Sequence, residues 1–208
     1  MNYETLYLFI VATASLAISP GPDNIYVLTQ SITNGKKYGL ATVAGLISGC
    51  LVHTTLLAFG VSAIIRANGA LYFGIKVFGA LYLLYLAFQV WRNDASIIFS
   101  DDKPSQKSLP QLFRRGFTMN VLNPKVTIFF LAFFPGFLFS DSMSTIIQFY
   151  VLGVLFMFVS GLIFSTIALL AGSISNYINT NRHVGAVLKW VQIIVFIGIA
   201  AYLLLSDK

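Results

Sequence analysis

The chain has 208 residues, of which 57% are hydrophobic and only 10% are charged, whereas a soluble globular domain carries about 25% charged residues. This balance excludes an ordinary water-soluble domain and indicates a protein that crosses a membrane several times. The formal net charge of +6 would suggest nucleic-acid binding in a soluble protein. Here the basic residues fall in short loops between apolar runs, where they orient a membrane protein, so we expect no nucleic-acid partner.

Six apolar stretches follow one another along the chain, each long enough to cross a hydrocarbon core about 30 Å thick. They cover residues 3–33, 40–65, 71–91, 116–139, 145–173 and 184–205. The polar stretch 92–115 is the only linker long enough to separate two halves. We therefore predict an all-α polytopic membrane protein of six transmembrane helices. Its first three-helix half spans residues 1–91, a cytoplasmic linker spans 92–115, and the second three-helix half spans 116–208.

Lysine and arginine are distributed unevenly over the connections between these stretches. One side would carry Lys36, Lys37, Arg92, Lys103, Lys107, Arg114, Arg115, Arg182 and Lys189, and the other only Arg66, Lys76 and Lys208. Because loops rich in Lys and Arg stay in the cytoplasm, we expect both termini on the non-cytoplasmic side. Each half holds an odd number of spans, so the second half enters the membrane in the opposite sense. The two halves are expected to be inverted repeats.

The first stretch contains two prolines and a glycine in the sequence SPGPDN. Proline lacks an N–H group and disfavours helical geometry in the residue before it. We expect extended backbone at Ile18 and Ser19, with Ser19 as the N-cap of a second half-helix. Pro20 or Pro22 would be its first helical residue.

The fourth stretch has a similar interruption in the sequence NPK. Extended backbone is expected in the two residues before Pro124, with Asn123 as N-cap and Pro124 as first helical residue. Pro20 precedes Gly49 by 29 residues, and Pro124 precedes Gly153 by the same number. The two breaks therefore occupy equivalent places. Paired breaks of this kind indicate a transporter binding site, and ordinary proline kinks are the alternative interpretation.

Each break is followed by an ionisable residue, Asp23 in the first and Lys125 in the second. A charge inside the bilayer costs at least about 2.5 kcal/mol, so it usually faces a cavity or an opposite charge. Asp23 and Lys125 could hold the ammonium and the carboxylate of a zwitterion, with half-helix N–H groups also contacting the carboxylate. Alternatively, Asp23 only stabilises its helix dipole and Lys125 snorkels toward the cytoplasmic face.

The motifs SPGPDN (19–24), GKKYGLATVAGLISG (35–49) and NPK (123–125) occur in this order in a chain of six apolar stretches. In these motifs the sequence resembles the lysine exporter (LysE/RhtB) family of bacterial amino-acid exporters. The resemblance implies a multi-pass protein of the inner (plasma) membrane, a secondary transporter and not an enzyme. It implies export of amino acids or close derivatives by proton antiport, without ATP and without a cofactor. Export of inorganic cations or another small metabolite on the same architecture is the alternative.

The resemblance also implies the site residues. Carried over by position, the substrate site comprises Pro20, Gly21, Pro22, Asp23 and Asn24 from the first motif and Asn123, Pro124 and Lys125 from the second. Asp23 is the candidate for proton coupling, because an antiporter needs a group that titrates as access alternates.

Several other residues in the apolar stretches are open to two interpretations. Gly45 and Gly49 form a small-xxx-small pattern, which predicts helix packing within one chain, with a homodimer face as the alternative. His53 could shuttle protons, but we favour a hydrogen-bonded interhelical histidine. Gln148 is expected to be an interhelical hydrogen-bond partner. Cys50 is the single cysteine and can form no internal disulfide, and no cluster with metal-ligand spacing indicates a metal site.

Overall fold

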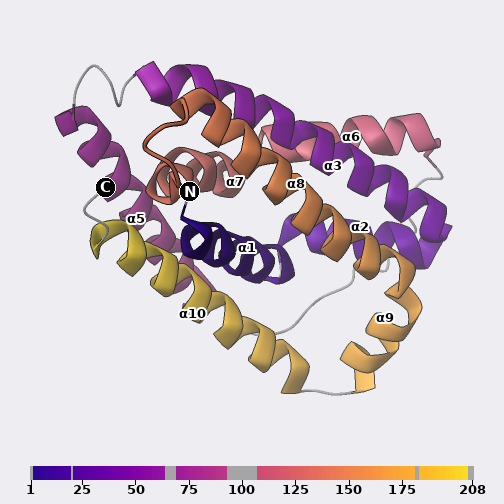
Figure 1. Cartoon of the computed structure of the whole chain (residues 1–208). Coiled ribbons are helices and arrows are strands. Elements are labelled where there is room, and N and C mark those ends of the chain that lie inside the picture. Colours follow the sequence, from indigo (N-terminus) through magenta and orange to yellow (C-terminus); the bar gives the residue numbers. More distant parts are fainter. Residues whose placement is uncertain (1, 20, 64–68, 93–106, 181–182, 206–208) are drawn as a thin grey trace.

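A computed structural model describes residues 2–19, 21–63, 69–92, 107–180 and 183–205 (Figure 1). Every regular element within these ranges is a helix, and none of them contains a strand. The first five helical elements are α1 (Tyr3–Ile18), α2 (Pro22–Asn34), α3 (Lys36–Leu56), a π-helical turn (Leu57–Val61) and α5 (Gly69–Arg92). They are followed by α6 (Leu109–Val121), α7 (Pro124–Ile128), a π-helical turn (Phe129–Phe133), a 3-10 turn (Phe134–Phe137), α8 (Thr145–Leu169), α9 (Ala171–Thr180) and α10 (His183–Leu205).

Four of the described segments are long and apolar enough to cross a membrane as single helices. They are Lys36–Val61, Gly69–Arg92, Thr145–Leu169 and Ala186–Leu205. Two further candidates are bent pairs: α1 and α2 meet at 58°, and α6 meets Pro124–Phe137 at 50°. The described chain therefore has four candidate spans, or up to six if each bent pair is one span. Both bends fall at the predicted proline breaks, and the all-helical, multi-pass character of the chain is confirmed.

The helices pack in two groups, which are joined by α1 and by the π-helical turn Phe129–Phe133 that contacts α5 and α10. α3 packs against α6 and α8, while α5 and α10 pack against each other. α1 contacts both α8 and α10 and lies between them (Figure 1). The site described below lies where α1 gives way to α2, beside α3, α6 and α8.

The backbones of α3 and α6 touch. A Cβ atom added to Gly45 would lie 2.0 Å from the carbonyl oxygen of Phe113, and one added to Gly116 would lie 2.3 Å from that of Thr42. Only glycine fits at both positions, because backbone atoms cannot give way as a flexible side chain can. Gly49 faces the same helix. The small-xxx-small pattern thus serves packing within the chain, as predicted.

A cluster of phenylalanines holds the segment that follows the second break. The rings of Phe129 and Phe133 stack at 4.3 Å between centroids, and those of Phe130 and Phe134 at 4.1 Å. Phe9 of α1 packs edge-on against Phe134 at 5.0 Å. These rings are all fully or nearly fully buried, and aromatic pairs of this geometry add stability beyond the area that they bury. The segment after the break is therefore anchored in the core.

The helix at the fourth predicted stretch, 116–139, begins earlier than the apolar run itself. α6 starts at Leu109, because Ser108 and Gln111 form a reciprocal capping box and Pro110 occupies the first turn. The last part of the predicted linker is therefore helical, and the linker's role stays a prediction.

Gln148 makes hydrogen bonds, but to a loop. Its Oε1 accepts from the N–H groups of Phe139 and Ser140, and its Nε2 donates to the carbonyls of Ser140 and Met143. The prediction that Gln148 bonds a partner on another helix is wrong. The turn before α8 has backbone groups that are not paired within a helix, and Gln148 lies close enough to bond them.

Candidate functional site

The first break spans two X–Pro steps. α1 ends at Ile18, and Ser19 acts as its C-cap, donating its N–H to the Ser15 carbonyl at 3.1 Å. Gly21 is extended, with φ −162° and ψ 177°, and is the N-cap of α2. The predictions of an extended Ile18 and of Ser19 as N-cap are wrong. Each proline restricts only the residue directly before it, so the new helix starts at the second one, Pro22.

Pro20 lies outside the described residues. Its assignment to the site stays a prediction.

The second break follows the predicted pattern more closely. Asn123 is the N-cap of α7, its Oδ1 accepting from the N–H of Lys125 at 3.0 Å, and Pro124 is the first helical residue. Asn123 has φ −77° and ψ 108°, but Leu122 has ψ near 1° and is not extended as expected. Again only the residue next to the proline is restricted.

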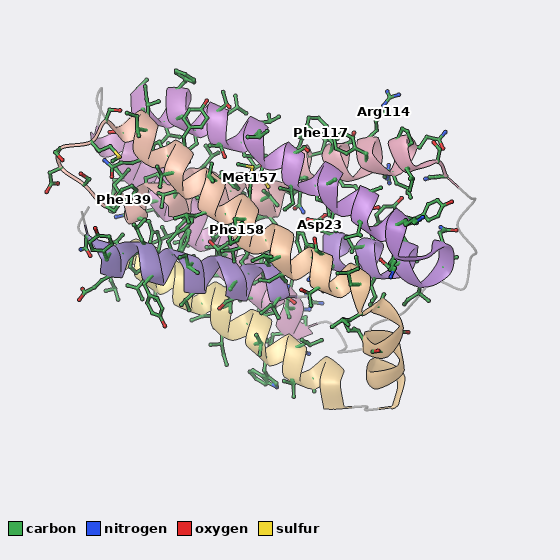
Figure 2. All side chains as sticks on the ribbon, turned by 45° about the vertical axis from the view of Figure 1, so that its right-hand side comes forward. Asp23, Arg114, Phe117, Phe139, Met157 and Phe158 are labelled. Carbon is green, nitrogen blue, oxygen red and sulfur yellow. The ribbon has the colours of Figure 1, made fainter. Side chains whose placement is uncertain are left out.

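One hydrogen bond joins the two breaks. The Nδ2 of Asn123 donates to the Oδ2 of Asp23 at 3.1 Å, across 100 residues of sequence. Asp23 is only 8% exposed, and Figure 2 shows it inside the bundle, whereas Arg114 projects from its outside. The other carboxylate oxygen, Oδ1, is buried without a hydrogen-bond partner among the described residues. Buried polar atoms are nearly always paired, so this oxygen is open to a donor.

Lys125 points toward the first break. Its Nζ lies 5.0 Å from the ring centroid of Phe196 in α10, at cation–π distance, and 3.7 Å from the position of a Cβ on Gly21. The hydrogen-bond partners of Asp23 do not include Lys125. The carboxylate and the ammonium thus lie near each other without pairing directly, which leaves both able to contact a third group.

Six of the eight predicted site residues line one cavity of about 40 Å³. They are Gly21, Pro22, Asp23, Asn24, Asn123 and Lys125. Pro124 does not line the cavity and is exposed. Asn24 also donates its Nδ2 to the carbonyl of Ala17 at 2.8 Å, which ties the start of α2 to the end of α1.

The cavity is small. A cavity needs about 10–15 Å³ to hold a single water, whereas pockets that hold organic ligands measure about 300–1,000 Å³. The structure therefore shows a narrow site with room for a few waters, and any larger ligand requires the surrounding helices to move apart.

Asn120 lines the cavity and was missed by the sequence analysis. It lies in the last turn of α6, and its carbonyl oxygen accepts from the Nε2 of His53 at 3.1 Å. Because a carbonyl can only accept, Nε2 carries the hydrogen. His53 is 4% exposed, and its predicted interhelical hydrogen bond is confirmed. Cys50 is buried beside Asn120, with Sγ 3.8 Å from its Oδ1.

Ser160 of α8 also lines the cavity and was not singled out from the sequence. Polar residues recurring every three to four positions would have marked the face of α8 that carries Ser160. The sequence of α8 has no such repeat, because the helix is apolar on all sides.

Comparison with known proteins gives consistent matches over nearly the whole chain. A family model described as LysE type translocator matches residues 14–207. The homoserine/homoserine lactone efflux protein of Salmonella typhimurium is 29% identical over 189 residues, which cover 91% of this chain and 91% of that protein. The leucine efflux protein of Salmonella choleraesuis is 26% identical over 205 residues, covering 98% of this chain and 94% of that protein. No solved structure matches the chain.

Proposed function

The chain belongs to the LysE type translocator family, and from this premise we propose that it exports amino acids or close derivatives across the bacterial inner membrane by proton antiport. The family consists of transporters rather than enzymes. Two relatives are named for the efflux of homoserine, homoserine lactone and leucine, which are amino acids or a close derivative. We extend that substrate class to this chain.

The Asp23–Asn123 hydrogen bond carries the proposal. It brings two proline-started helix tips to one cavity, which Lys125 also lines. The unpartnered Oδ1 of Asp23 would accept from the substrate's ammonium group, and Lys125 would hold its carboxylate. The first N–H groups of α2 have no partner within the helix and would add donors to the carboxylate. A zwitterion matches both charges at once.

The same carboxylate supplies a simple coupling scheme. Asp23 would bind either the substrate's ammonium or a proton, but not both. If Asp23 releases the substrate outside and takes up a proton there, the proton must be released inside before the next substrate binds. Competition for one group thus yields antiport, provided that the narrow cavity opens to the two sides in turn.

We propose further that the predicted halves, 1–91 and 116–208, form two inverted repeats joined by a cytoplasmic linker at 92–115, with α6 extending the second repeat back to Leu109. The packing supports this pairing, because α3 contacts its counterpart α8, α5 contacts its counterpart α10, and α6 lies on α3 as α1 lies on α8. Figure 1 places the beginning of α1 and the end of α10 toward one end of the bundle, and the start of α3 and of α6 toward the other. The basic residues near those starts would place that end in the cytoplasm and both termini outside it.

Purified protein in proteoliposomes would test the proposal. An inward-directed proton gradient should drive efflux of at least one amino acid from the side that corresponds to the cytoplasm. Asp23→Asn keeps the shape of the side chain but removes its charge, and should reduce this flux by about tenfold or more. The matched control is Asp141→Asn, which removes an exposed loop carboxylate and should leave the flux unchanged.

A panel of dipeptides fed to expressing cells would identify the substrate, since the exported amino acid accumulates outside faster than in cells without the protein. Indifference to every amino acid together with a flux of a metal ion would instead favour the export of inorganic cations. Equal fluxes for Asp23→Asn and the unaltered protein would remove Asp23 from the coupling scheme.

A further inference from the structure

Hydroxyl groups inside the helices of this protein follow a common pattern. Seven of those in the described helices donate to the backbone carbonyl one turn earlier, at 2.7 to 3.1 Å, which satisfies the hydroxyl locally. The residues that do so are Ser15, Ser31, Thr42, Ser48, Thr54, Thr127 and Thr166.

Ser160 departs from this pattern, and so do Thr13 and Ser62, which do not line the cavity. Ser160 lies in the middle of α8 and is only 2% exposed, yet its Oγ has no hydrogen-bond partner among the described residues. The residue lines the cavity between the two breaks. Among the residues that line this cavity, only Asp23 and Ser160 have a fully buried oxygen without a partner. A buried hydroxyl that forgoes its local carbonyl is available to a group inside the cavity.

The cavity-lining residues on either side of Ser160 in α8 are apolar. Phe156 and Phe164 lie one turn before and one turn after it on the same face of α8, and both line the cavity, as does Ile47 of α3. No other serine, threonine or tyrosine is among the residues that line it. The cavity thus combines the polar groups of the two breaks and of Asn120 with an apolar wall that carries one hydroxyl.

We propose that Ser160 determines specificity by hydrogen-bonding a polar group on the substrate's side chain. The preferred substrates are then small α-amino acids whose short side chain carries one uncharged hydrogen-bonding group, such as a hydroxyl. This inference rests on the proposed function, in which the ammonium and carboxylate occupy the Asp23–Lys125 end. A charged side chain would be desolvated against the phenylalanines without a counter-ion. An aliphatic side chain of equal size would leave the hydroxyl of Ser160 unpaired.

Pairs of isosteric substrates isolate this contact. Threonine and valine differ by a hydroxyl in place of a methyl group, and so do homoserine and norvaline. In proteoliposomes the unaltered protein should transport the hydroxylated member of at least one pair in preference. Ser160→Ala should lower the ratio of hydroxylated to aliphatic flux by about tenfold, the effect of one neutral hydrogen bond. The aliphatic member should be transported at nearly the same rate as before.

Two further variants complete the test. Ser31→Ala removes a buried hydroxyl that is satisfied by the Val27 carbonyl, and should not change the ratio. Ser160→Cys keeps a weak donor of similar size and should give an intermediate ratio, which also covers the case in which Ser160→Ala folds poorly.

The outcomes separate this inference from the proposed function. Export of amino acids with no preference within any pair would overturn the role of Ser160 while the proposed function stands. Equal losses for both members of a pair in Ser160→Ala would do the same, because they would indicate a structural role or a bound water. If the unaltered protein moves no amino acid at all, both proposals fail.

Discussion

The carboxamide of Asn123 bonds in two directions. Its Oδ1 caps α7 through the N–H of Lys125, and its Nδ2 donates to Asp23. The helix that starts after the proline break needs an N-cap, and Asn, Asp, Ser and Thr are the residues that fill this position best. Of these, only asparagine combines an acceptor with an amide donor in one rigid group. The residue therefore connects the local geometry of the break to the long-range geometry of the site.

Asn123→Asp separates these two roles. The acceptor oxygen that caps α7 is kept, but the donor is replaced by a second carboxylate oxygen facing Asp23. Two carboxylates about 3 Å apart cannot both be ionised. We expect amino-acid export to fall by about tenfold or more, with a shift of only a few degrees in the unfolding temperature of the detergent-solubilised protein.

Asn123→Ala is the comparison for this variant. It removes the cap as well, which costs about 1 kcal/mol, so its unfolding temperature should be the lower of the two. Export by Asn123→Asp at the unaltered rate would show that the hydrogen bond to Asp23 does not matter for transport.

At the scale of the elements, the contact between α3 and α6 places half of the site. Gly45 and Gly116 allow the two backbones to touch, and this close approach brings Asn120, at the end of α6, against Gly49 and His53. The position of the second break therefore depends on Gly116, about two turns before it, and on Gly45 of α3.

Gly116→Ala should disturb this arrangement. The new Cβ would lie 2.3 Å from the carbonyl oxygen of Thr42, and backbone must shift to admit it. Overpacking of this kind costs about 1–3 kcal/mol, so we expect the unfolding temperature in detergent to drop by several degrees. Gly198→Ala in α10, where nothing lies within 4 Å of the added Cβ, should be neutral or slightly stabilising. Equal stability of the two variants would contradict the close packing.

At the scale of the whole molecule, the proposed topology assigns successive connections to opposite sides of the membrane. Ser108 and Ser142 are both exposed and lie in connections predicted to be on opposite sides of the membrane. The single native thiol, that of Cys50, is buried. A membrane-impermeant maleimide should therefore report only on cysteines that are introduced.

Labelling of intact cells would test the orientation. We expect Ser142→Cys to react from outside, and Ser108→Cys to react only after the membrane is permeabilised, because Lys and Arg gather near Ser108. The unaltered chain is the control for background labelling of Cys50. The reverse pattern would invert the proposed topology and place both termini in the cytoplasm.

Much of the fold was predictable from local properties of the sequence. Span lengths follow from runs of apolar residues, and the bends follow from Pro22 and Pro124, since proline acts on its immediate neighbours. Asn123 as a cap could be predicted for the same reason. Ser19 could not, because two successive X–Pro steps compete and only the structure shows which one starts the helix.

The sequence by itself determined the family, the helical membrane-spanning character, and the presence of one acid and one base at two breaks. Each of these depends on composition, local proline chemistry or motif order. Tertiary structure alone decided that Asp23 bonds Asn123 rather than Lys125, and that Asn120 and Ser160 line the same cavity. In nearly uniform apolar helices the rotation about the helix axis leaves no periodic pattern to read. It is set by close contacts such as those of Gly45 with α6, which appear only when the helices are packed together.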